Sequence, residues 1–390
     1  MDGRYVPLEP RGPEDARFLI VTDVPTPASA DENRLMTKYQ AKILADHLAD
    51  ANIDTSQFRF IPACHCAFDP NEHLNKEKTA AIKHCRQHFL AEVETHDYEA
   101  LIPLGATAAS QVIGKQTKIT KVRGLVTEAI DLPTPVFPLM SPAVVAAYPQ
   151  NAPVFAADIQ SLARAINADY DIAAAASQQV GEYEIVTDLQ FLIDMDPEVV
   201  SFDTETTGLR WYQSGVDVRS YRPSLHKGKS IFQPRFQILT MQFTVEDGKG
   251  YMLVWDHPEN PIPESQKPKL RNQLRQLLCK PERLVVGQNP KFDNVALWMT
   301  EGIRFRIGGD TLMLATLVDE NMPERNLDTL TKIYVPEMGG YADVFNATYD
   351  KSRMWEVPLK DLVNYGCGDT DSAYRLYHRL EEKVSADDGQ

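Results

Sequence analysis

The arrangement of apolar segments is the feature that most limits what this chain can fold into. Between residues 18 and 166, short apolar runs alternate with longer segments of helical spacing, and a second alternating block starts at residue 183. This alternation predicts an α/β fold, with a largely parallel sheet in the first block. Because 390 residues exceed the size at which one core usually keeps growing, we expect two domains.

A segment without periodicity separates the two blocks. Residues 167–184, NADYDIAAAASQQVGEYE, are mostly small and polar, a composition typical of linkers. We therefore expect a domain over residues 1–167, a linker over residues 168–182 and a second domain over residues 183–390. The expected strands include RFLIVTDVP, FRFIPAC, EALIPLG and PVFPLMSP in the first domain, and EVVSFDTE, FQILTMQFTV and GYMLVW in the second.

Composition excludes several classes of protein. Five cysteines without framework spacing, and no charged-then-apolar leader, favour a reducing cytoplasm. No apolar run is long enough to span a membrane, so we expect no membrane partner. The net charge of −15 disfavours a protein that coats nucleic acid. If nucleic acid is the substrate, metal ions or local basic patches must offset that charge.

Two carboxylates stand directly behind one of the apolar runs. In EVVSFDTETTGL, Asp203 and Glu205 are two residues apart, so on a strand both side chains point to one face. Such a pair is costly in repulsion and desolvation unless a cation lies between the two groups. A divalent metal ion is the usual partner, although a solvated strand end has the same spacing. Gly208 permits a tight turn that would deliver Leu209 to the rim of the same site.

Two later segments add polar side chains where strands and helices meet. In VVGQNPKFDNVALW, an apolar strand end runs into Asn289 and a helix bearing Asp293. In LVNYGCGDTDSAYRLY, Tyr365 and Asp369 lie one helical turn apart and share a face, from which Asp371 is rotated away. Asp293 alone could be a first-turn carboxylate favoured by the helix dipole, and Tyr365 alone a core tyrosine. The three segments in this order favour one shared site.

Together, FDTETTGL, NPKFD and YGCGD resemble the three motifs of the DEDD 3′–5′ exonucleases. The similarity is to the tyrosine subgroup, which includes RNase D and the proofreading domains of family A DNA polymerases, and it covers residues 183–384. It implies an RNase H-like fold and a site for two divalent cations, Mg²⁺ or Mn²⁺. The implied metal ligands are Asp203, Glu205, Asp369 and, in part through water, Asp293. Tyr365 would orient the water that attacks the terminal phosphodiester.

The same resemblance implies contacts with the substrate. These contacts would come from Thr206, Leu209, Gln288 and Asn289, with Leu209 wedged against the terminal base. Tyr341, in GGYADVF, is expected either to stack on the frayed end or to pack locally. Residues 218–236, VRSYRPSLHKGKSIFQPRF, interleave cations with aromatic rings. This composition is typical of a guide for single strands, and also fits a solvated insertion.

The first block contains four segments that carry a second similarity: LIVTDVPTP, ALIPLGATAASQVIG, KVRG and VFPLMSPAVVAAYP. They resemble the uracil-DNA glycosylase superfamily, chiefly its iron–sulfur branch. The resemblance spans residues 16–166 and implies a three-layer α/β domain. Asp23, followed by Pro25, matches the acid-bearing turn of that family. Where the family has a His-Pro-Ser motif, this chain has Ser141-Pro142 and the histidine is missing.

The cysteines of this block do not complete the four-cysteine cluster of that branch. Cys64 or Cys66, together with Cys85, falls near family positions, but no N-terminal cysteine pair precedes them. His65 and His84 beside them are more often surface residues than metal ligands. We therefore expect no iron–sulfur cluster. Since a fold alone does not imply an activity, we expect a domain that is silent as a glycosylase and serves in DNA handling or docking.

The sequence thus predicts a metal-dependent 3′–5′ exodeoxyribonuclease acting on single-stranded or frayed DNA 3′ ends. The expected partner is a replicative DNA polymerase of the family A type, as a separate chain or as a further C-terminal domain. The expected setting is the cytoplasm of a bacterium or of a virus-infected (phage-infected) cell. Two alternatives stay open: an RNA-trimming nuclease like RNase D, and a non-catalytic replication adaptor.

Overall fold

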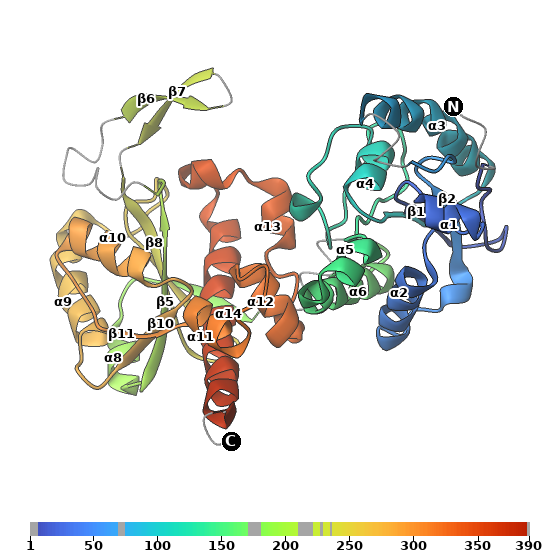
Figure 1. The fold of residues 1–390 in the computed structure, drawn as a ribbon. Helices are drawn as coiled ribbons and strands as arrows, with labels where there is room; N and C mark the ends of the chain where they lie inside the picture. The colour runs from blue at the N-terminus through green and yellow to red at the C-terminus, as the bar shows by residue number, and fades with distance from the viewer. Residues whose placement is uncertain are drawn as a thin grey trace. The chain divides into compact units, whose positions relative to one another are not determined.

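The computed structural model describes residues 7–68, 75–170, 181–209, 221–226, 229–234 and 236–387. The chain divides into two compact units, Met1–Ala175 and Ala176–Gln390 (Figure 1). Each unit has its own sheet and its own hydrophobic core. Among the helices in these ranges, none is long and apolar enough to cross a membrane.

The N-terminal unit is built on a parallel sheet in the order β2-β1-β3, which confirms the expected α/β class. Its strands are β1 (Phe18–Thr22), β2 (Phe58–Pro62) and β3 (Ala100–Pro103). Its helices are α1 (Pro27–Asp31), α2 (Lys38–Asp50), α3 (Asn75–Thr95), α4 (Ala106–Ile113), α5 (Pro142–Ala147) and α6 (Ala152–Asn167).

The fourth expected strand of this unit, PVFPLMSP, is only partly formed. It makes isolated parallel bridges from Val136 to Leu101 and from Leu139 to Leu104. Phe137 N donates to Leu101 O at 2.8 Å and Leu139 N to Pro103 O at 2.9 Å. Pro103 has no amide hydrogen to donate in return, which interrupts the ladder.

The C-terminal unit contains a mixed six-stranded sheet in the order β11-β10-β5-β8-β9-β4. The strands are β4 (Glu182–Val186), β5 (Val199–Thr206), β8 (Ile238–Glu246), β9 (Lys249–Val254), β10 (Leu284–Gly287) and β11 (Ile307–Asp310). Strand β5 runs parallel to β10 and antiparallel to β8. This central position gives β5 neighbours on both edges and helices on both faces.

Alternation along β5 sends its side chains to two different layers. Val200 and Phe202 join the core formed with α8 (Gln190–Met195), α9 (Lys267–Leu278) and α10 (Lys291–Glu301). Asp203 and Glu205 point instead toward α14 (Leu359–Asp387). Helix α14 packs with α11 (Thr311–Val318), α12 (Leu327–Tyr334) and α13 (Asp343–Thr348) in the second core (Figure 1).

Two glycines of the YGCGD motif allow α14 to lie close to its neighbours. A Cβ atom at Gly366 would stand 2.8 Å from Gln242 Nε2 on β8, and one at Gly368 would stand 2.4 Å from the ring of Tyr341. Both distances are shorter than packed atoms tolerate, so a side chain at either position would displace the helix or its neighbour. Gln242 pairs with Asp203 in the β5–β8 ladder. The contact at Gly366 therefore brings the third motif next to the first.

The predicted strand guide, residues 218–236, is in part a β-hairpin. Its backbone forms β6 (Tyr221–His226) and β7 (Lys229–Pro234), inserted between β5 and β8 in the sequence (Figure 1). The side chains of the hairpin, and residues 218–220, 227, 228 and 235, lie outside what the structure describes. The guiding role of this segment stays a prediction.

Asp371 anchors the C-terminal unit and does not face the predicted site. Its fully buried carboxylate accepts hydrogen bonds from Tyr183 Oη at 2.9 Å, from Gly248 N at 3.0 Å and from Arg375 Nε at 2.8 Å. These donors belong to β4, to the turn between β8 and β9, and to α14 itself. One carboxylate thus joins three parts of the unit.

We expect Asp371→Asn to destabilise the protein by about 2 to 4 kcal/mol, because the mostly buried guanidinium of Arg375 loses its nearer counter-charge and keeps only Glu337, whose Oε1 lies 3.6 Å from Arg375 Nη1. Urea unfolding followed by circular dichroism measures the change. Glu246→Gln serves as the control, since it removes an exposed ion pair with Lys249 and should cost less than about 1 kcal/mol. Equal losses in the two variants would contradict the anchoring role of Asp371.

Candidate metal centre and active site

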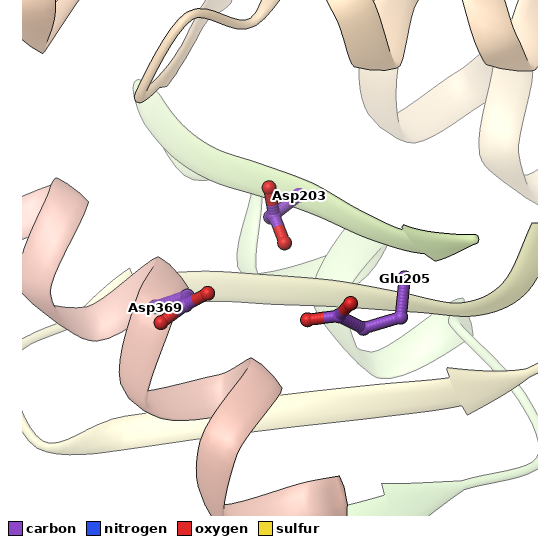
Figure 2. Close-up of side chains that lie close together, drawn as sticks. All are labelled: Asp203, Glu205 and Asp369. Atoms are coloured by element: carbon purple, nitrogen blue, oxygen red, sulfur yellow. The ribbon is translucent and has the colours of Figure 1, made fainter. Parts of the chain in front are cut away.

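Three carboxylates from two elements converge on one point. Asp203 and Glu205 extend from β5 and Asp369 from α14, and one oxygen atom of each lies within 4.8 Å of the other two (Figure 2). Within the described ranges, no other three acidic, histidine or cysteine side chains come together in this way. The three side chains are partly exposed, so solutes can reach them. A set of oxygen donors without nitrogen or sulfur fits Mg²⁺ or Mn²⁺.

Asp293, the fourth predicted ligand, stands beside this group. It is buried in the first turn of α10, and its Oδ1 accepts hydrogen bonds from Thr204 N at 3.1 Å and from Thr204 Oγ1 at 2.6 Å. The ladder between β5 and β10 ends at Ser201, so Asp293 binds the part of β5 beyond that ladder. Sequence reasoning missed Thr204. Its position could have marked it, because Thr204 lies between Asp203 and Glu205 in the sequence and its side chain therefore points to the opposite face of the strand.

The environment raises the pKa of the four predicted carboxylate ligands, Asp203, Glu205, Asp293 and Asp369. Loss of water around Asp203 and Glu205, followed by repulsion from neighbouring carboxylates, raises their pKa values well above the ordinary range. Burial raises the pKa of Asp369 to about 6 and that of Asp293 to about 7. The charge of Lys351 lowers the pKa of Glu205 and Asp369, but less than burial raises it. The site therefore favours the arrival of positive charge.

Tyr365 lies beside the carboxylates in a fixed orientation. Its ring stacks on Phe345, with centroids 3.9 Å apart and an interplanar angle of 12°. Its hydroxyl oxygen accepts a hydrogen bond from Lys351 Nζ at 2.8 Å. Burial and the neighbouring carboxylates raise the pKa of Tyr365 well above its usual value, so the phenol keeps its proton as a donor. Lys351 lies 14 residues before Tyr365, and no motif spacing marked it.

Of the predicted substrate contacts, Leu209 is presented to incoming molecules, and Asn289 carries an acceptor that is unsatisfied within the described residues. Leu209 is 81% exposed, as a wedge against a base would need to be. Asn289 has a positive φ of 56°, and its backbone N donates to Asp310 Oδ1 at 3.0 Å. In the described part of the chain, the buried Oδ1 of Asn289 has no hydrogen-bond partner. This oxygen must become exposed before it can accept a hydrogen bond from a substrate.

The other predicted contacts are occupied within the protein. Gln288 Nε2 donates to the Arg325 carbonyl at 2.7 Å, and Gln288 Oε1 accepts from Thr311. Thr206 Oγ1 donates to the Gly208 carbonyl at 2.9 Å, which holds the turn before Leu209. In this structure Thr206 supports the adjacent turn, and Gln288 holds the backbone at Arg325.

Tyr341 is brought to the site, but as part of its interior. Its ring is 8% exposed and belongs to the core around α14. Its hydroxyl donates to Asp369 Oδ1. The structure therefore places Tyr341 as a buried partner of a carboxylate, with its ring facing protein atoms.

In the N-terminal unit, Asp23 and Ser141 meet at Gly105. A Cβ atom at Gly105 would lie 3.2 Å from Asp23 Oδ2 and 3.1 Å from Ser141 Cβ. Asp23 Oδ1 accepts from Val24 N at 2.8 Å. Ser141 Oγ accepts from Ala143 N at 3.3 Å and so caps α5. The polar atom of Ser141 is thus used by its own helix.

The predicted thiols lie near one another in the same unit. Cys64 and Cys85 are buried with their Sγ atoms 3.7 Å apart, and Cys66 packs against them. Their thiols do not form a three-ligand group of the kind made by the carboxylates, as far as the described residues go. The His65 and His88 rings stand 5.0 Å apart beside them.

Comparison with solved structures gives matches at low identity. NrnC of Brucella melitensis with bound Mg²⁺ is 15% identical, with a TM-score of 0.35 over 53% of this chain and 81% of that chain. RNase D of Escherichia coli, an exoribonuclease involved in structured RNA processing, is 14% identical, with a TM-score of 0.33. The match covers 53% of this chain and 46% of that chain. RNase D of Trypanosoma brucei, in complex with GMP, is 14% identical, with a TM-score of 0.36. The match covers 51% of this chain and 57% of that chain.

Comparison with curated protein sequences gives no match. Family models match both units. The uracil DNA glycosylase superfamily matches residues 9–163, and a family described as 3′-5′ exonuclease matches residues 183–385. The second match covers more than half of the 390 residues. The chain therefore belongs to the 3′-5′ exonuclease family, with a domain of the uracil DNA glycosylase superfamily preceding its exonuclease domain.

Proposed function

We propose that the C-terminal unit removes nucleotides from single-stranded or frayed DNA 3′ ends in a reaction that depends on two divalent cations. The convergence of Asp203, Glu205 and Asp369 carries this proposal. Their oxygens would hold the cations, with Asp293 contributing from the side, in part through water. When bound, the cations would supply activation of water and stabilisation of charge on both reacting oxygens of the phosphodiester.

The remaining residues of the site bind and orient the reacting groups. The protonated hydroxyl of Tyr365 orients the attacking water, and Lys351 and Phe345 hold that hydroxyl in place. Leu209 wedges against the terminal base. Asn289 accepts a hydrogen bond from the substrate through its unpartnered Oδ1.

DNA is the favoured substrate because the same chain contains a domain of a DNA glycosylase superfamily. The presence of both domains in one chain is best explained if both act on the same kind of nucleic acid. An RNA-trimming nuclease is the competing function, and matched DNA and RNA substrates distinguish the two. A non-catalytic adaptor is disfavoured, because an acidic group of this kind is costly to keep without a cation.

A DNA polymerase is the proposed partner, either as a separate chain or as a further domain. The net charge of −15 opposes tight binding to nucleic acid through phosphate contacts alone. A polymerase would deliver frayed 3′ ends to the site, and the exonuclease would then act in proofreading. The N-terminal domain, silent as a glycosylase, would serve in docking to that partner or to template DNA.

Asp203→Ala and Asp369→Ala should each abolish degradation, because each removes a ligand of the cations.

Tyr365→Phe should leave an enzyme slowed by about 10²-fold or more, since it removes only the orientation of water. The assay follows 5′-labelled DNA and RNA of matched sequence with Mg²⁺, with Mn²⁺ or with EDTA, and Glu246→Gln serves as the control. Near-normal turnover by Asp203→Ala would reject the assigned site. Faster loss of RNA would favour the trimming nuclease.

Cation binding should stabilise the protein more at high pH than at low pH. The folded pKa values of Asp369 and Asp293, about 6 and about 7, exceed the value of about 4 for an unfolded aspartate. In metal-free protein, the stability linked to these groups is therefore present below about pH 4 and is lost as pH rises through about 6 to 7. Mg²⁺ should raise the midpoint of thermal unfolding more at about pH 8 than at about pH 5. An equal shift at both values would contradict this account.

The N-terminal domain should not release uracil from DNA. A glycosylase must stabilise the departing uracil anion, and removal of one well-placed donor typically costs about 10²- to 10³-fold. Here Ser141 replaces the donor, and its oxygen caps α5. The assay incubates uracil-containing DNA with the nuclease-dead Asp203→Ala chain and then cleaves abasic sites with alkali. Strand breaks at uracil that disappear with Asp23→Ala would show a working glycosylase.

A further inference from the structure

Asp369 is restrained by a side chain from outside its own helix. The Tyr341 hydroxyl donates a hydrogen bond to Asp369 Oδ1. Tyr341 precedes α13, and Asp369 lies 28 residues further along, on α14. The contact therefore links a separate segment to one of the three carboxylates that converge at the site.

The ring of Tyr341 is fixed by close packing. It is 8% exposed, and it lies directly against Gly368, the residue before Asp369. A Cβ atom at Gly368 would stand 2.4 Å from the ring, so the absence of a side chain there makes room for the tyrosine. A buried ring in such a space has little freedom to turn away. Its hydroxyl is consequently held toward one oxygen of Asp369.

Tyr365 also forms a hydrogen bond with Asp369, but further partners that Tyr341 does not share hold it in place. Its hydroxyl accepts from Lys351 Nζ at 2.8 Å, and its ring stacks on Phe345. The contacts with Lys351 and Phe345 should therefore keep Tyr365 in its orientation when the Tyr341 hydroxyl is removed.

We propose that Tyr341 is a positioning residue of the metal centre. By fixing Oδ1 of Asp369, it presents the other carboxylate oxygen in a set direction before a cation arrives. Partners that orient ligands in this way typically change metal affinity by about 10- to 100-fold when they are removed. The identity of the cations in this inference rests on the proposed exonuclease function. The contact itself rests on the hydrogen bond between Tyr341 and Asp369.

Tyr341→Phe tests the inference because it keeps the ring and removes only the hydroxyl. Isothermal titration with Mn²⁺, without nucleic acid, should give an affinity about 10-fold below that of the unsubstituted chain. Tyr183→Phe is the matched control: it deletes a tyrosine hydroxyl that donates to Asp371 Oδ2 at 2.9 Å on the same helix. The control should bind Mn²⁺ as the unsubstituted chain does. In an Asp369→Asn background, Tyr341→Phe should cause no further loss of affinity.

Activity separates the roles of the two tyrosines. Tyr341→Phe should raise the half-saturating Mg²⁺ concentration about 10-fold and approach the normal rate at saturation. Tyr365→Phe should stay slow at every Mg²⁺ concentration.

Two outcomes overturn the inference and leave the proposed function intact. One is unchanged Mn²⁺ affinity in Tyr341→Phe while the unsubstituted chain degrades DNA. The other is loss of folding in Tyr341→Phe, judged by thermal unfolding, which would make the hydroxyl a structural group. An unsubstituted chain that binds Mn²⁺ but degrades no nucleic acid would instead overturn the proposed function.

Discussion

The close approach of α14 to β8 is the constraint on which the site depends. Gly366 lies against Gln242, and Gln242 is paired with Asp203 across the β5–β8 ladder. This contact sets the height of the helix above the sheet, and so the reach of Asp369 toward the carboxylates of β5. A helix displaced outward would carry Asp369 away from the carboxylates of β5, which now lie within 4.8 Å of it.

That geometry has an electrostatic cost that the surrounding fold sustains. Burial and mutual repulsion raise the pKa values of the carboxyl groups, so the metal-free site resists full ionisation. Hydrogen bonds from Thr204 to Asp293 and from Tyr341 to Asp369 fix two of the groups in place. The apolar cores on both faces of the sheet supply stability that offsets the cost of placing these carboxyl groups together. A functional site that opposes the stability of its scaffold is a common arrangement in enzymes.

Sequence reasoning succeeded where the signal was periodic. The α/β class, the strand that carries Asp203 and the one-turn spacing of Tyr365 and Asp369 follow from repeats of two and of about 3.6 residues. The side position of Asp293 was not derivable from spacing, because it depends on where the β5–β10 ladder ends and on the Thr204 hydroxyl. The buried place of Tyr341 depends on room left by a glycine 27 residues away in the chain. The domain boundaries and the residue roles remain predictions.

The hydrogen bond between Tyr183 and Asp371 also bears on how the unit is made. It joins the first strand of the sheet to the last helix across 188 residues of sequence. A chain leaves the ribosome from its N-terminus, so Asp203 and Glu205 emerge long before Asp369 and Asp371. Contacts this distant in sequence form late and slowly. The carboxylate group and the anchor that secures its helix are therefore completed together, once residues 369–371 have been synthesised, and a nascent chain carries no assembled nuclease site before that point.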